Sequence, residues 1–142
     1  MIPSHQESDS ALNRAKLCLE KSQEFYLGNC RETNNKLESD LFSMNLLTKN
    51  ERLMAFDIAL DEITKSDRSG PSPPNDYPTH PPYKKVRMFA FAWHSAEFKR
   101  QMYMKFGILD NPAPEKLIIF SFHPSRYILR VEVSNEEDNE LF

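Results

Sequence analysis

One stretch of the chain alternates basic and aromatic side chains in a pattern that could bind single-stranded nucleic acid. In an extended strand, residues at every second position share one face. Aromatic rings on such a face stack on bases, while cationic side chains hold phosphates. The residues that share this face are Arg87, Phe89, Phe91 and Trp93. The alternative is that these aromatic side chains form core beneath a helix.

Further cations follow this stretch and could extend it into a basic patch. The three most suitable are Lys99, Arg100 and Lys105. Between residues 83 and 130 the chain carries nine basic and three acidic residues, which gives a net charge of +6. Residues 131–142 carry five acidic residues and no basic one, a net charge of −5. The basic part favours nucleic acid as a possible partner.

No motif in the sequence commits the protein to a reaction. It has no Gly-x-Ser-x-Gly elbow and no phosphate-cradling loop, and it contains only three glycines. A metal site needs three or four convergent ligands, and the topology expected below could place His94 and His123 at opposite ends of the sheet. We expect no metal, no cofactor and no enzymatic activity; the alternative is an active site assembled across the linker. Cys18 and Cys30 are expected to be reduced thiols.

The C-terminal half predicts a small unit of three strands and one helix. Residues 84–93 alternate with period two and are apolar on both faces, which is typical of a central strand. Phe98, Met102 and Phe106 recur every four residues, which predicts a helix that ends at Gly107.

Two further strands are predicted after this helix. They cover residues 117–122 and 127–133, and the turn at 123–126 joins them into a hairpin. The predicted order of the unit is therefore β-α-β-β.

The N-terminal third is predicted to be helical. Thr48 and Glu51 have capping-box spacing, so a helix should follow over 49–65 and fold back to cover the small sheet. The helices before it carry more apolar residues than a surface helix needs. We therefore expect them to pack against a protein partner or a second copy of the chain. The residues predicted at that interface are Leu12, Leu19, Leu37, Leu41 and Met44.

These elements define an α+β fold with four segments. Six of the ten prolines fall within residues 67–82, which predicts a proline-rich linker. The linker separates a helical hairpin or three-helix segment (1–66) from the β-α-β-β unit (83–133), and an acidic tail (134–142) follows.

The sequence shows neither a membrane span nor a signal peptide. No apolar run approaches the ~18 residues that a spanning helix needs. The first residues also lack the basic stretch followed by an apolar one that marks a secretory signal. These features predict an intracellular protein, cytoplasmic or nuclear, with no membrane partner.

Two functions follow from these observations. The first is a non-catalytic adaptor or scaffold subunit of a larger complex, which binds a protein partner or a second copy through the N-terminal helices. The alternative is a module that binds single-stranded RNA or DNA through the basic, aromatic sheet face.

Overall fold

The computed structural model describes residues 4–28, 31–69, 77–78 and 82–125. The helices are α1 (His5–Ser22), α2 (Arg31–Ser43), α3 (Lys49–Glu62) and the short 3-10 helix η1 (Lys65–Asp67). The strands are β1 (Tyr26–Leu27), β2 (Arg68–Ser69), β3 (Phe89–Ser95), β4 (Arg100–Leu109) and β5 (Lys116–Pro124). The predicted α+β class is confirmed.

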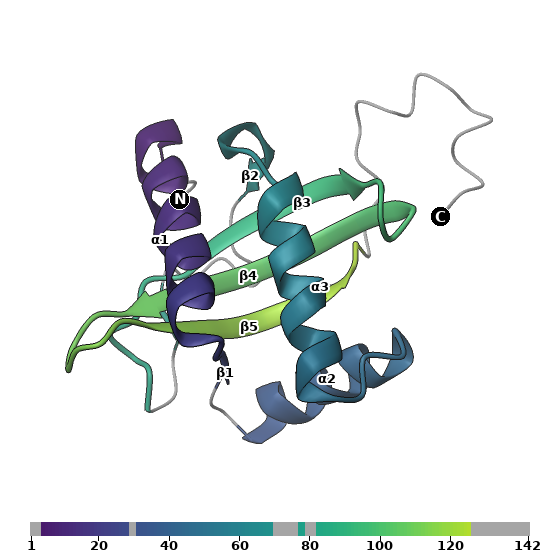
Figure 1. Ribbon diagram of the computed structural model, residues 1–142, viewed down its shortest axis with the longest axis horizontal. Coiled ribbons are helices and arrows are strands. Elements are labelled where there is room, and N and C mark those ends of the chain that lie inside the picture. Colours follow the sequence, from purple (N-terminus) through teal and green to yellow (C-terminus); the bar gives the residue numbers. More distant parts are fainter. Residues whose placement is uncertain (1–3, 29–30, 70–76, 79–81, 126–142) are drawn as a thin grey trace.

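The five strands form one mixed sheet in the order β1-β5-β4-β3-β2. The long strands β3, β4 and β5 make an antiparallel meander at its centre. At the edges, β1 pairs in parallel with β5, and β2 pairs antiparallel with β3. Figure 1 shows α1 and α3 in front of the three long strands, so the helices lie over one face of the sheet.

The helix predicted after Ser95 does not form, and the β-α-β-β order is therefore wrong. Residues 96–99 form a turn in which Lys99 has a φ of 60°, and the chain then returns as β4. The four-residue spacing of apolar residues misled the prediction, because four is also a multiple of the strand period of two. The side chains of β4 that enter the core under the helices in fact fall at every second position, namely Met102, Met104, Phe106 and Ile108.

Gly107 lies inside β4 and does not end a helix. A Cβ atom added there would overlap Cγ1 of Val86 and lie 2.7 Å from the carbonyl oxygen of Arg87. The segment that leads into β3 therefore crosses directly over Gly107, on the sheet face opposite the helices. Only glycine permits so close an approach of two backbones.

Capping boxes start two of the α-helices. The Thr48 hydroxyl accepts a hydrogen bond from the Glu51 backbone N–H at 3.1 Å, and the Glu51 carboxylate accepts one from the Thr48 N–H at 2.8 Å. This confirms the start predicted for the third helix. Ser4 and Glu7 make the same reciprocal pair before α1.

One apolar core joins the helices to the sheet. The Phe56 ring of α3 contacts the rings of Phe25 and Phe122 edge-on, with centroids 4.9 and 5.1 Å apart. The core also contains four leucines of α1 and α2, none more than 3% exposed: Leu12, Leu19, Leu37 and Leu41. Met44 packs against its edge. The four leucines predicted to contact a partner are thus packed within the chain itself, which contradicts the predicted interface, while Met44 is partly buried.

Several predicted segments lie outside the described residues. They are the strand at 127–133, the acidic tail at 134–142 and most of the linker at 67–82. Within the described part of that linker, Arg68 and Ser69 pair with Phe91 and Ala90 as β2.

Candidate nucleic-acid interface

The aromatic residues proposed as a base-stacking face belong to the core. Phe91 is 0% exposed and Trp93 is 3% exposed. The Phe91 ring stacks on the ring of Phe106 with centroids 5.7 Å apart, and Phe89 packs at the border of the same core. The core alternative is therefore correct for these side chains, and bases cannot stack on them.

Arg87 is likewise engaged within the protein. Its guanidinium donates a hydrogen bond to the Glu7 carboxylate at 2.9 Å and lies 5.3 Å from the centre of the Phe89 ring. A hydrogen bond from the Ser4 backbone and the interaction with Arg87 lower the pKa of Glu7. Arg87 thus ties the segment before β3 to the start of α1.

The Glu62 carboxylate fixes the end of α3 to the β3–β4 hairpin. It accepts hydrogen bonds from Trp93 Nε1 at 2.9 Å, Ser95 Oγ at 2.7 Å and the Glu97 backbone N–H at 2.9 Å. Burial by itself would raise the pKa of Glu62, but the hydrogen bonds outweigh burial and lower it. These bonds satisfy the buried Trp93 and Ser95 side chains, so they serve structure rather than chemistry.

The opposite face of the same strands carries polar side chains. The pairing of His94 with Gln101 and of Tyr103 with His123 brings residues from β3, β4 and β5 side by side. Alternation along each strand then assigns six side chains to one end of this face. We call them the polar cluster: His94, Gln101, Tyr103, Lys105, Ser121 and His123.

Contacts within the polar cluster order its two histidines. The ring of His123 stacks on the ring of Tyr103 with centroids 5.3 Å apart, and its Nδ1 lies 2.7 Å from the Pro124 carbonyl oxygen. Because a carbonyl oxygen only accepts, Nδ1 carries the proton and donates to it. In a neutral imidazole, Nε2 is then the acceptor nitrogen. His94 Nδ1 lies 3.5 Å from Gln101 Nε2. Both histidines therefore lie at the same end of the sheet, because a strand and not a helix returns the chain.

Three members of the polar cluster are nearly enclosed, and His123 is 9% exposed. Gln101 is 6% exposed, and its Oε1 has no hydrogen-bond partner in the described part of the chain. A ligand that donates a hydrogen bond would satisfy this acceptor. Lys105 is 7% exposed, and burial lowers the pKa of its ammonium group.

The pairing of β4 with β5 is interrupted by a bulge at Phe120. This bulge separates the pair Lys105–Ser121 from the pair Phe106–Ile119.

Five cations of the sheet unit form no ion pair within the residues that the structure describes. They are Lys84, Lys85, Lys99, Arg100 and Lys116. Two nearby acids, Asp110 and Glu115, are both engaged by Arg14 of α1, the latter at 2.8 Å. This pairing raises the pKa of Arg14, chiefly through the bond to Glu115. The cations of the sheet unit therefore retain an uncompensated positive charge.

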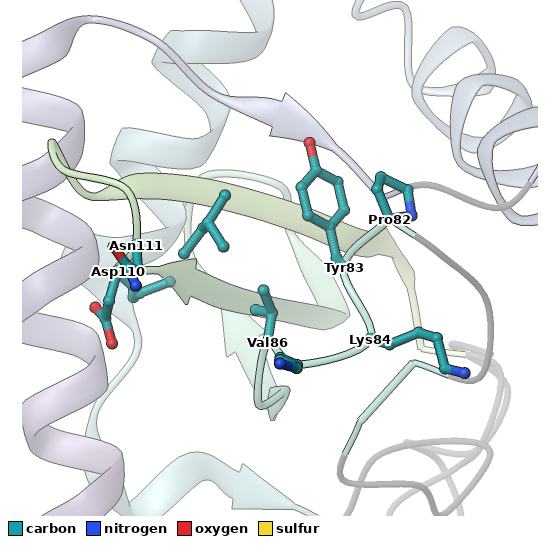
Figure 2. A pocket seen from close by; sticks show the side chains of 9 residues that line it. Pro82, Tyr83, Lys84, Val86, Asp110 and Asn111 are labelled. Atoms are coloured by element: carbon teal, nitrogen blue, oxygen red, sulfur yellow. The ribbon is translucent and has the colours of Figure 1, made fainter.

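A pocket of about 560 Å³ lies at the other end of β4. It is lined by two stretches of chain, Pro82–Val86 and Ile108–Asn111. Figure 2 shows Tyr83 and Pro82 on one side, Asp110 and Asn111 on the other, and Val86 between them. Burial, with a smaller contribution from nearby Tyr26, raises the pKa of the Tyr83 hydroxyl.

The described residues show no other site of catalytic character. Among them, no three His, Cys, Asp or Glu side chains converge as metal ligands. The thiol of Cys18 is buried, donates to the Glu115 carbonyl oxygen at 3.1 Å, and has a pKa raised chiefly by that burial. No described helix has the length and hydropathy needed to cross a membrane.

Sequence reasoning chose Phe91 and Trp93 on the helix-covered face of β3, where both side chains are buried. It included Lys99, Arg100 and Lys105 but missed Gln101, Tyr103 and Ser121. The available signal was the run Gln101-Met102-Tyr103-Met104-Lys105, where polar and apolar residues alternate strictly. That pattern indicates a strand with one polar face.

Comparison with known proteins adds no assignment to this geometry. No family model, no curated protein and no solved structure matches the chain.

Proposed function

We propose that the protein binds single-stranded nucleic acid on the sheet face opposite the helices. The observation that carries this proposal is the set of five cations without an acidic partner in the described chain, arranged around the polar cluster and the pocket. Lys99 and Arg100 lie in the hairpin next to the polar cluster. Lys84 and Lys85 lie on the segment that crosses the other half of the face.

The aromatic residues of this face supply the second requirement. Tyr103 in the polar cluster and Tyr83 in the pocket are both half-buried, so each ring is supported from behind and accessible in part. Stacking of one base on an aromatic side chain is worth ~1–3 kcal/mol and tolerates any base. Together with the cations, the two tyrosines form the kind of surface that single strands bind, and duplex DNA would not reach their rings.

The test is binding of a fluorescein-labelled oligouridylate at 50 and 200 mM salt. The variant in which Lys84, Lys85, Lys99 and Arg100 are all alanine should bind more weakly. Its plot of log K against log salt should be shallower by up to about 3, because each contact contributes ~0.7 for a single strand. A matched control replaces four lysines in or just after the helices with alanine: Lys16, Lys21, Lys36 and Lys65. Equal loss in both variants, or no binding by the wild type at 50 mM salt, would refute the proposal.

A second candidate function is the protein adaptor predicted from the sequence, now on a different surface. Phe42 at the end of α2 is 69% exposed, and Leu47 before α3 is 49% exposed. Both flank the turn in which Asn45 has a φ of 65°. An apolar segment of a partner protein could cover them.

Crosslinking followed by mass spectrometry tests this second candidate. The double variant Phe42→Ser/Leu47→Ser should lose the partner that the wild type crosslinks at this turn. The quadruple alanine variant of the cations should retain it. If the double variant still crosslinks to the same partner, this surface is not the binding site.

A further inference from the structure

The pocket beside β4 has the chemistry of a nucleotide site. Its walls include the Tyr83 ring and the aliphatic side chains of Val86 and Leu109, which suit a flat and largely apolar group. Its rim carries Lys84 and Lys85, both exposed, which suit an anionic group attached to it. A nucleobase with its phosphate combines these two features.

The polar end of the pocket narrows the choice of base. Asn111 is exposed there, and an asparagine amide both accepts and donates a hydrogen bond. Asn pairs in this way with N6 and N7 of adenine. Asp110, next to it, is bonded to Arg14, which also binds Glu115, so the negative charge at this end is offset in part.

We propose that this pocket takes an adenine nucleotide, with the base against Tyr83, its edge on Asn111 and its phosphate near Lys84 and Lys85. The proposal rests on the function proposed above in one respect, since the nucleotide belongs to a bound strand. Tyr103 and Leu109 are six residues apart on β4, or about 20 Å at ~3.4 Å per residue. A strand a few nucleotides long can therefore contact the polar cluster while one base occupies the pocket.

Titration of the uniformly ¹⁵N-labelled protein with AMP, UMP and inorganic phosphate tests the pocket alone. AMP should shift the amide signals of residues 83–86 and 108–111 and bind more tightly than UMP. Tyr83→Leu should weaken AMP binding roughly tenfold, in line with the loss of one stacking contact. Asn111→Ala should reduce the preference for AMP over UMP. Tyr77→Leu, at an exposed tyrosine outside the pocket, is the control.

The outcomes separate this inference from the proposed function. If inorganic phosphate produces the same shifts at the same concentration as AMP, the pocket is an anion site and the inference is wrong. If oligouridylate binds but AMP leaves these signals unchanged, the inference fails and the proposed function stands. If AMP binds but an adenine-containing tetranucleotide binds no better, the pocket takes a free nucleotide. The proposed path of a strand from the pocket to the polar cluster is then wrong.

Discussion

The two faces of the central sheet are built from the same three strands but differ in almost every side chain. The face under the helices carries large apolar groups such as Phe91, Met104 and Phe122, all fully buried. Trp93 Nε1 and Ser95 Oγ on this face are bonded to Glu62.

The opposite face carries alanines in β3, a smaller buried apolar cluster and the polar cluster; the apolar cluster consists of Val86, Met88, Ile118 and Phe120. Each side of the sheet has one buried side-chain oxygen without a partner among the described residues, Ser8 Oγ of α1 on the helix side and Gln101 Oε1 on the other. One face is therefore packed throughout under the helices, while the other combines a smaller apolar cluster with polar side chains.

The largest expected effect is at the centre of the helix-covered face. Phe106→Ala should lower the free energy of unfolding by ~3–5 kcal/mol, because it opens a cavity in a closed core. Urea unfolding followed by Trp93 fluorescence measures it. Phe42→Ala is the matched control, since that ring is exposed and should cost less than ~0.5 kcal/mol. Equal losses would mean that Phe106 is not enclosed in the core as described.

A smaller effect is expected where the opposite face is covered. Gly107→Ala should destabilise the protein by ~1–3 kcal/mol, because its Cβ would overlap Val86 and crowd the backbone of Arg87. The amide signals of residues 86–88 should shift with it. A fully stable variant would show that this segment does not lie over β4.

Glu62→Gln should cost about 1–2 kcal/mol, because three donors lose a charged acceptor at a partly exposed site. The pH dependence follows from the lowered pKa of Glu62. A carboxyl whose pKa is lower in the folded state stabilises the protein above its unfolded pKa, and this contribution is lost as the pH falls through the folded pKa. The wild type should therefore lose more stability than the variant on acidification below about pH 4.5. Parallel curves of melting temperature against pH would exclude this role.

The smallest effect on stability is expected in the polar cluster. His94 is exposed, so His94→Ala should change the unfolding free energy by less than ~0.5 kcal/mol. The same variant should bind oligouridylate more weakly than the wild type, because His94 borders the proposed path of the strand. Unchanged binding together with unchanged stability would remove His94 from the interface.

Local signals were read correctly where the residues decide the structure by themselves. Thr48 and Glu51 cap a helix because the donor and acceptor lie three residues apart, whatever packs around them. Residues 117–122 form a strand as predicted, whereas only 89–93 of the strand predicted over 84–93 do so, because residues 84–88 cross over β4. The errors arose at Met102 and Phe106, where one spacing fits two periods, and at the leucines of α1 and α2, where the sequence does not show what covers an apolar face.

The sequence by itself determined the α+β class, the strand character of Phe89 to Trp93 and the excess of cations between residues 83 and 130, because these depend on composition and period. Only the tertiary structure decided which face of β3 is buried. Helices could cover either face of a strand that is apolar on both sides. In the structure, Phe91 and Trp93 share one core with the apolar residues of α3, so the helices cover the face that carries these two side chains. The same packing gathers His94, Tyr103 and His123 from three strands, because strand pairing sets which residues are neighbours across a sheet.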